Sequence, residues 1–129
     1  MNVKNFLMLA AVVSLAYGLS FFLVPQAAAD VYGYGAVTTP LSTLILQFFG
    51  ITFIAAAAMC YVARNAEKSP GLTAVLSFLA VSGLLFLYMN IKTMVVGDEG
   101  MMNYLDLAVN VVIGFGAVYF LMRDSKKMA

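Results

Sequence analysis

LSTLILQFFGITFIAAAAMCYVA, residues 41–63, decides the fold class, because none of its side chains is charged. Pro40 precedes this run and Arg64 follows it. A proline costs little in the first helical turn, where its missing N–H would have no partner. A helix of about 20 apolar residues crosses the roughly 30 Å hydrocarbon core of a bilayer. The run therefore predicts a membrane-spanning helix.

Three further apolar runs flank this one and have similar lengths. They cover residues 6–24, 72–91 and 104–122. Strands of a transmembrane barrel would alternate apolar and polar residues over about 10 positions, and these runs do not alternate. Short connections make consecutive helices antiparallel neighbours. We therefore expect an all-α, polytopic membrane protein, with residues 1–129 forming a single domain that is an antiparallel bundle of four transmembrane helices. No internal repeat is evident in the sequence.

The composition of the chain excludes several classes of protein. Hydrophobic residues make up 64% of the 129 residues and charged residues 10%, and the mean hydropathy is +0.97. Soluble domains have about 45–50% apolar and about 25% charged residues. A disordered chain, a basic nucleic-acid-binding domain and an ordinary soluble enzyme are therefore excluded. The sequence has no histidine and one cysteine, Cys60, so it has no Ser-His-Asp or Cys-His set, no internal disulfide and no histidine ligand for haem or zinc.

The first apolar run has two interpretations. Ala27, Ala28 and Ala29, just before Asp30, look like a signal-peptide cleavage site. However, the run of residues 6–24 is longer than the 7–15 residues or so of a signal-peptide core. We therefore expect it to be a retained span.

Basic residues indicate the orientation of the spans. Six of the seven lie at one end of the expected bundle: Lys4, Arg64, Lys68, Arg123, Lys126 and Lys127. Only Lys92 lies at the other end, which is acidic and carries Asp30, Asp98, Glu99 and Asp106. Lys and Arg are enriched in short cytoplasmic segments. We therefore expect a multi-pass protein of the cell inner (plasma) membrane with both termini in the cytoplasm.

Polar side chains within the spans gather toward the expected outer side. These candidates are Tyr17, Gln47, Tyr88, Asn90, Lys92, Asp106 and Asn110. Asp106 and Asn110 are four residues apart and share one helix face, which Gly114 continues. Ionisable groups at membrane depth are candidates for a ligand or ion site, whereas amides in spans also serve only to join helices. Lys92 is in addition a candidate ion-pair partner for Asp106. The sequence leaves these alternatives open.

Small residues are concentrated in the second and fourth spans, at Gly50, residues 55–58, Gly114, Gly116 and Ala117. Small side chains let helix backbones approach closely. We expect them to pack helices of the same chain, with an oligomer interface as the alternative.

Three stretches resemble small four-helix bacterial membrane proteins of the DoxX-like kind. They are GLSFFLVP at residues 18–25, LQFFG at residues 46–50 and NVVIGFGAVYFLM at residues 110–122. The family often has arginine where Gln47 stands. The resemblance implies a four-helix membrane fold and a link to redox or quinone-associated membrane systems.

These observations lead to two expectations about function. The first is a non-catalytic integral membrane protein, an accessory or structural subunit that packs in a larger membrane complex or a homo-oligomer. The alternative is a binder or carrier of a small apolar or amphipathic molecule, a lipid or quinone, through the outer polar cluster. We expect membrane lipid and a protein partner or second copy as partners. We expect no nucleic acid, cofactor or metal.

Overall fold

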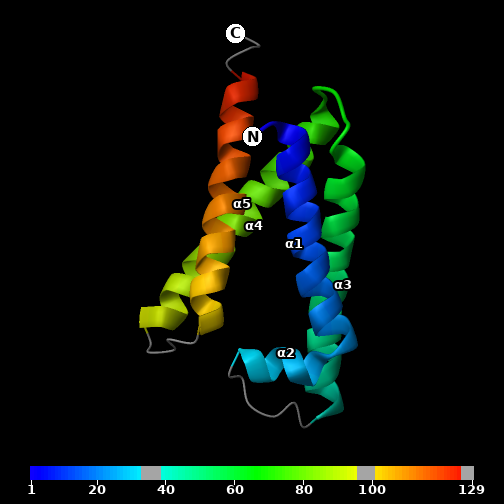
Figure 1. The fold of residues 1–129 in the computed structure, drawn as a ribbon, viewed down its shortest axis with the longest axis vertical. Coiled ribbons are helices and arrows are strands. Elements are labelled where there is room, and N and C mark those ends of the chain that lie inside the picture. Colours follow the sequence, from blue (N-terminus) through cyan, green and yellow to red (C-terminus); the bar gives the residue numbers. More distant parts are fainter. Residues whose placement is uncertain (33–38, 96–100, 126–129) are drawn as a thin grey trace. The chain divides into compact units, whose positions relative to one another are not determined.

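A computed structural model describes residues 1–32, 39–95 and 101–125, and in this part of the chain all regular structure is α-helical. Five helices follow one another, as Figure 1 shows: α1 (Val3–Leu23), α2 (Pro25–Val31), α3 (Pro40–Ala63), α4 (Pro70–Val95) and α5 (Met101–Ser125). Four of them are long and apolar enough to cross a membrane: α1, α3, α4 and α5. The expectation of four transmembrane helices in an all-α chain is confirmed at this level.

The helix ends are set by capping groups that the sequence supplies. Asn2 Oδ1 accepts a hydrogen bond from Asn5 N at 2.8 Å before α1. Thr39 and Ser42 form a reciprocal capping box before α3, and Ser69 Oγ accepts from Leu72 N at 3.2 Å before α4. Such caps satisfy N–H groups that have no partner within the helix. As a result α1, α3 and α4 begin one to three residues earlier than the apolar runs alone predict.

Two predicted boundaries were wrong. The sequence predicts a loop from Pro25 to Thr39 between the first two spans, but the first part of this segment is the helix α2. Pro25 stands at the first helical position, three alanines follow, and Gln26 Nε2 donates a hydrogen bond to Asp30 Oδ1 one turn later. Alanine is the strongest helix former, and this local preference outweighs the turn-like composition around it. The second boundary is the end of the third expected span, at residue 91. The helix α4 continues past Lys92 to Val95.

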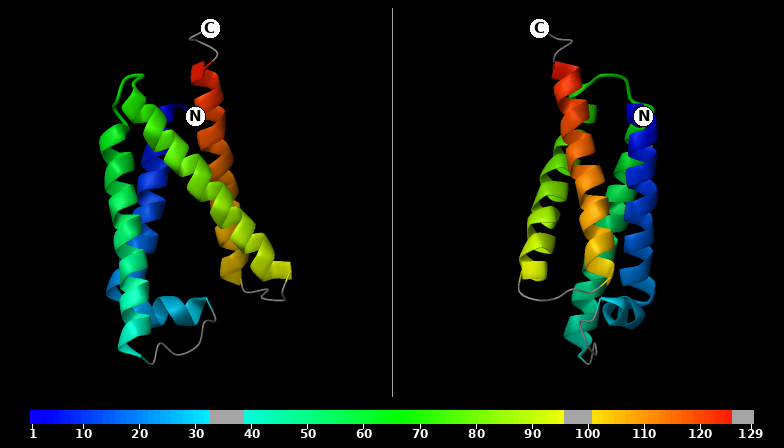
Figure 2. Two further views of the ribbon diagram at one scale, coloured as in Figure 1. Left: turned by 180° about the vertical axis from the view of Figure 1, so that it is seen from behind. Right: turned by 60° about the vertical axis from the view of Figure 1, so that its left-hand side comes forward.

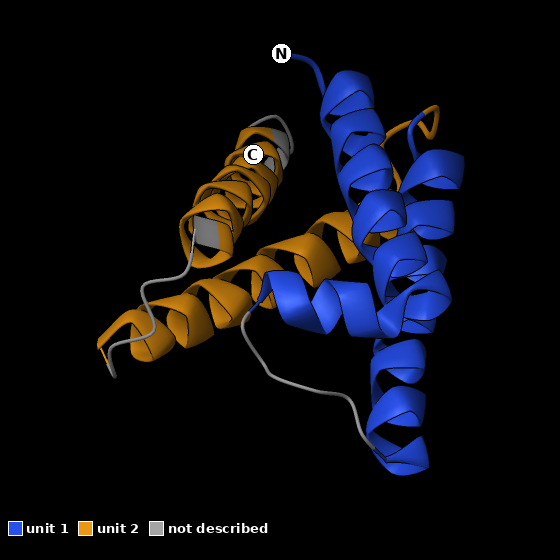
Figure 3. Ribbon diagram, turned by 60° about the horizontal axis from the view of Figure 1, so that its bottom comes forward, with its two compact units in different colours: residues 1–64 blue, residues 65–129 orange. Residues whose placement is uncertain are grey.

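The chain divides into two compact units, which Figure 3 distinguishes by colour. Unit 1 is residues 1–64 and contains α1, α2 and α3. Unit 2 is residues 65–129 and contains α4 and α5. Each unit is described separately below, and the single domain over residues 1–129 stays a prediction.

In unit 1, α1 and α3 form an antiparallel hairpin (Figure 1). The two helices touch at Gly18 and Gly50. A Cβ on Gly18 would lie 2.9 Å from the Gly50 carbonyl oxygen and 2.7 Å from Ile54 Cγ1. A Cβ on Gly50 would lie 2.8 Å from the Gly18 oxygen and 2.7 Å from Phe22 N. Real Cβ atoms are not found this close to backbone atoms. The hairpin therefore depends on glycine at both positions.

A chain of aromatic rings runs beside this crossing. Starting from the residue after α2, it consists of Tyr32, Phe21, Phe49, Phe53 and Tyr17, with successive ring centroids 5.6, 5.4, 4.9 and 5.8 Å apart. Ring pairs at such separations add about 0.5–1.5 kcal/mol to the free energy of burial. The stacking of Tyr32 on Phe21 holds the end of α2 against α1, and Figure 1 shows α2 lying across the end of the hairpin.

Unit 2 is a second hairpin, formed by α4 and α5 (Figure 2). Its helices also cross at two glycines. A Cβ on Gly83 of α4 would lie 2.7 Å from Gly114 Cα and 2.8 Å from Gly114 N of α5. Gly83 follows Gly18 by 65 residues, and Gly114 follows Gly50 by 64. The two hairpins thus place their crossings at equivalent points, a regularity that is not evident in the sequence.

Candidate functional site

The seven predicted polar residues divide between the two units. Tyr17 and Gln47 belong to unit 1, and the other five belong to unit 2: Tyr88, Asn90, Lys92, Asp106 and Asn110. The predicted cluster therefore divides into one group on the α1–α3 hairpin and another on the α4–α5 hairpin.

An amide–amide hydrogen bond joins the two helices of unit 2. Asn110 Nδ2 on α5 donates to Asn90 Oδ1 on α4 at 2.7 Å, and both side chains are half-buried. Thr93 lies one turn beyond Asn90, and its hydroxyl bonds within α4. It donates to the Asn90 backbone carbonyl oxygen at 2.8 Å. Bonds of this kind between membrane helices contribute about 0.6–2 kcal/mol. Asn90 and Asn110 are the pair that the structure brings together.

A polar stripe continues from this pair along α5. Asn103, Asp106 and Asn110 follow at intervals of three and four residues, which places them on one face of the helix. Asn103 is 6% exposed, and Asp106 and Asn110 are half-buried. Gly114 and Ala117 are buried and extend the same face toward the glycine crossing. Polar groups thus line the inner face of α5 toward its N-terminus.

Sequence reasoning missed Asn103, the buried polar residue of this stripe. The expected fourth span begins at residue 104 and leaves Asn103 in the preceding loop, whereas α5 begins at Met101 and includes Asn103. Its position three residues before Asp106 was the available signal, because residues three apart lie on one helix face.

Tyr88 and Lys92 lie elsewhere on α4. Both are exposed, and they are four residues apart, so they share a helix face. Asn90 lies between them in the sequence and therefore lies on a different face of the helix. The ion pair between Lys92 and Asp106 stays a prediction.

Tyr17 and Gln47 have structural surroundings in unit 1. Gln47 Nε2 donates to the Phe22 carbonyl oxygen of α1 at 3.4 Å, one turn from the Gly50 crossing. The Tyr17 ring stacks on Phe53 of α3, with centroids 5.8 Å apart. Both contacts join α1 to α3, so both residues hold the hairpin together.

The small residues serve two different surfaces of α3. Gly50 and Ala57 are buried, and Gly50 lies at the α1 crossing. Thr52, Ala55 and Ala58 are exposed and spaced three residues apart. Packing within the chain is therefore confirmed for glycines of both hairpins, and α3 still presents a second small-residue surface.

The helix ends carry cation–aromatic contacts. The Arg64 guanidinium lies over the Tyr61 ring at 3.4 Å at the end of α3 and donates to the Tyr61 carbonyl oxygen. Arg123 lies over Phe120 at 5.3 Å near the end of α5. Arginine above an aromatic ring is typical of a membrane–water interface, where the ring stays in apolar surroundings and the charge reaches water.

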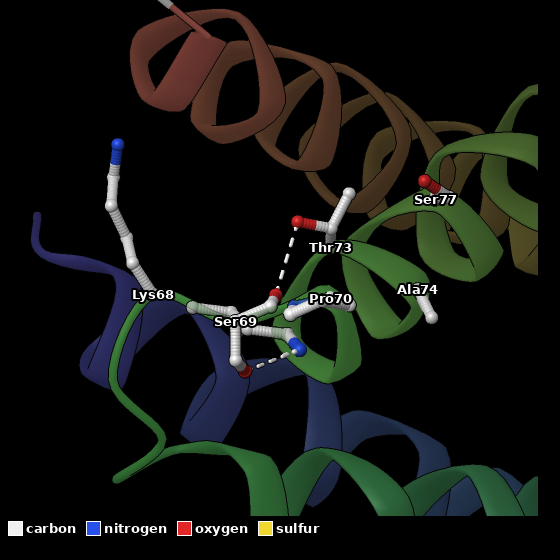
Figure 4. Close-up of a pocket in the computed structure, with 7 residues that line it drawn as sticks. Lys68, Ser69, Pro70, Thr73, Ala74 and Ser77 are labelled. Atoms are coloured by element: carbon white, nitrogen blue, oxygen red, sulfur yellow. Dashed lines mark hydrogen bonds between the residues drawn. The ribbon is translucent and has the colours of Figure 1, made fainter. Parts of the chain in front are cut away.

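A pocket of about 480 Å³ lies at the start of α4, lined by Lys68, Ser69, Pro70, Leu72, Thr73, Ala74 and Ser77. Two of its hydroxyl groups bond within the start of the helix (Figure 4): Ser69 Oγ accepts from Leu72 N, and Thr73 Oγ1 donates to the Ser69 carbonyl oxygen. We therefore attribute this pocket to the first turn of α4 and do not assign it as a ligand site. Within residues 1–32, 39–95 and 101–125, no group of three or more Cys, Asp and Glu side chains could hold a metal ion. Asp98 and Glu99 lie outside the described residues.

No protein-family model, curated protein or solved structure matches this chain.

Proposed function

We propose that this chain is a non-catalytic integral membrane subunit that packs against a larger membrane complex or a second copy of itself. Its four long apolar helices make it a multi-pass membrane protein. The supporting observation is the exposed surface of α3 formed by Thr52, Ala55 and Ala58, which we call the α3 small face. Small residues exposed along a spanning helix allow another helix to approach closely.

The rest of the hairpin supports this proposal by contrast. Bulky apolar side chains are exposed on both sides of the α3 small face along the helix, including Phe48 at 65% and Val62 at 77%. Such side chains suit lipid tails, whereas alanine and threonine offer lipid little surface. The α3 small face is therefore the part of α3 best suited to a protein helix.

The experiment is gentle detergent extraction followed by size-exclusion chromatography with mass determination. We expect a particle larger than one chain. Replacing both Ala55 and Ala58 with Phe should shift it toward a single chain, because the larger rings block close approach. Ala108→Phe is the matched control, since Ala108 is an exposed alanine on a different helix, α5. A monodisperse single chain without a co-purifying protein would exclude the proposal.

The topology belongs to the same proposal. We place the chain in the cell inner membrane with both termini in the cytoplasm, supported by Lys4, Arg64, Lys68 and Arg123 at helix ends that this orientation makes cytoplasmic. A reporter fused after residue 129 should be active in the cytoplasm. A periplasmic readout would reverse the orientation.

A second candidate function is the binding of a small amphipathic molecule, a lipid or quinone. The observation that favours it is the Asn90–Asn110 pair with Asp106 on the same stripe, because the membrane-spanning part of a hairpin seldom holds so many polar groups. The DoxX-like resemblance would connect this candidate with quinone-associated membrane systems. Mass spectrometry of the intact extracted protein distinguishes the two functions, since it reveals either a bound protein or a bound small molecule.

A further inference from the structure

We propose that the α4–α5 hairpin binds an aminophospholipid, with the primary ammonium of the headgroup at Asp106 and the ester region at Asn90 and Asn110. This inference rests on the second candidate function and specifies its ligand. Three observations support it: the unused hydrogen-bonding capacity of the amide pair, its accessibility, and the order of the polar groups along α5.

The amide pair has more hydrogen-bonding capacity than its one bond uses. Each asparagine side chain offers two N–H donors and an oxygen that accepts two bonds. The bond between Asn110 Nδ2 and Asn90 Oδ1 occupies one donor and one acceptor site. Within the described part of the chain, Asn90 Nδ2 and Asn110 Oδ1 make no hydrogen bond. The pair can therefore donate to, and accept from, a third molecule.

These atoms are accessible from outside the hairpin. Both side chains are half-buried, and among the described residues no buried side-chain nitrogen or oxygen lacks a partner. The unbonded amide atoms are therefore not fully enclosed by the chain. At the depth of a spanning helix their surroundings are lipid or protein, where an unsatisfied polar group is unfavourable. A hydrogen-bonding molecule at this position would remove that cost.

The polar groups lie in the order of the parts of a phospholipid. Counting from the start of α5 at about 1.5 Å per residue, Asp106 lies roughly 7 Å along the helix and Asn110 roughly 13 Å along it. A carboxylate nearer the helix end meets the headgroup region. Amide N–H groups one turn deeper meet the ester carbonyl oxygens, which accept hydrogen bonds. Phe86 lies one turn deeper than Asn90 on the same face of α4 and is exposed, so its ring suits an acyl chain.

Asp106 selects the headgroup. A carboxylate binds an ammonium group with N–H donors through charge-assisted hydrogen bonds, which a trimethylated ammonium cannot form. An ionised carboxylate accepts about four hydrogen bonds. Asp106 already interacts within the chain, and the proposed ammonium would add to that interaction.

The test is a binding titration of the purified full-length protein, followed by mass spectrometry of the intact protein. The probes are phosphatidylethanolamine and phosphatidylcholine with identical acyl chains. We expect phosphatidylethanolamine to bind about tenfold more tightly, the effect of one charge-assisted hydrogen bond. Asp106→Asn, which keeps the shape of the side chain, should abolish this preference.

Two further variants test the amide pair. Asn110→Leu and Asn90→Leu should each weaken phosphatidylethanolamine binding several-fold. Gln47→Leu is the matched control, because this amide also joins two helices next to a glycine crossing but has no carboxylate on its stripe, and its binding should stay unchanged. Circular dichroism and a monodisperse elution profile verify that each variant is folded.

The outcomes separate this inference from the function on which it rests. Equal binding of the two phospholipids by the unaltered protein, or equal loss in Gln47→Leu and Asn110→Leu, would overturn the aminophospholipid site. Binding of a quinone or of lipid without headgroup preference would leave the second candidate function standing and still overturn this inference. Binding of no small molecule would overturn both.

Discussion

The two hairpins share one backbone plan and surround it with different side chains. In each, a glycine of the first helix meets a glycine of the second, at positions 65 and 64 residues apart in the chain. Unit 1 packs a chain of five aromatic rings beside its crossing. In unit 2, Asn103, Asp106 and Asn110 lie on its second helix, α5, and Asn110 is hydrogen-bonded to Asn90 of α4. The same backbone approach thus supports an apolar hairpin in one unit and a polar one in the other.

The crossings also differ in symmetry. In unit 1 a Cβ on either glycine would lie under 3.0 Å from backbone atoms of the opposite helix. In unit 2 a Cβ on Gly83 would meet Gly114 at 2.7 Å, whereas a Cβ on Gly114 would meet Gly83 at 3.2 Å. Unit 1 therefore requires glycine on both helices, and unit 2 requires it mainly on α4.

The largest expected effect is the loss of a crossing. Gly83→Ala should lower the free energy of unfolding by about 1–3 kcal/mol, because the helices must separate to admit the methyl group. Titration of the full-length protein with a denaturing detergent measures this change. Gly71→Ala is the control, since a Cβ there meets nothing closer than Ser69 Oγ at 3.7 Å. Similar losses in both variants would mean that the crossing does not determine the stability of unit 2.

The difference in symmetry gives the next effect. Gly18→Ala and Gly50→Ala should destabilise the protein by similar amounts. Gly114→Ala should cost at least about 1 kcal/mol less than Gly83→Ala, because its neighbours need to move only slightly. The same titration compares the four variants. If Gly114→Ala proves as costly as Gly83→Ala, both units require glycine on both of their helices, and the two crossings do not differ.

The helices could be predicted from the sequence because hydrophobicity and length determine them. All four expected spans are present as helices, with ends shifted where caps such as Asn2 and Thr39 act. The helix α2 was missed because its alanines occur in a segment with the composition of a turn. The pairing of Gly18 with Gly50, and of Gly83 with Gly114, could not be predicted, since a glycine in a span does not specify which helix it meets.

The candidate site could be predicted only in part, for a related reason. Helical spacing was sufficient to place Asp106 and Asn110 on one face of α5. The contact of Asn110 with Asn90 depends on how α4 and α5 cross, and the spacing of residues along the sequence does not predict that crossing. Tyr88 and Lys92 were grouped with Asn90 because they are near in sequence and similar in depth, yet a helix turns residues two apart to different sides.

The hydrogen bond between Asn90 and Asn110 gives a third difference in stability between the two hairpins. In a double-mutant cycle, Asn90→Leu and Asn110→Leu should show a coupling energy of about 0.6–1.7 kcal/mol, the range of hydrogen bonds between membrane helices. Gln47→Leu in unit 1 should cost less than Asn110→Leu, because its bond to the Phe22 carbonyl is longer, at 3.4 Å against 2.7 Å. A coupling near zero would mean that the polar contact does not stabilise unit 2.

The smallest expected effect concerns Lys92 and Asp106, and it decides how far the polar side of unit 2 depends on an ion pair. Lys92 is exposed in the last turn of α4, and Asp106 is half-buried. Ion pairs with an exposed partner contribute about 0–1 kcal/mol, because water screens the charges. A cycle of Lys92→Met and Asp106→Asn should therefore show a coupling of about 0.5 kcal/mol. A coupling of several kcal/mol would instead indicate a desolvated pair, since removing either partner would leave a buried charge. In that case Asp106 would be committed to Lys92, and unit 2, like unit 1, would use its distinctive side chains for stability rather than for a ligand.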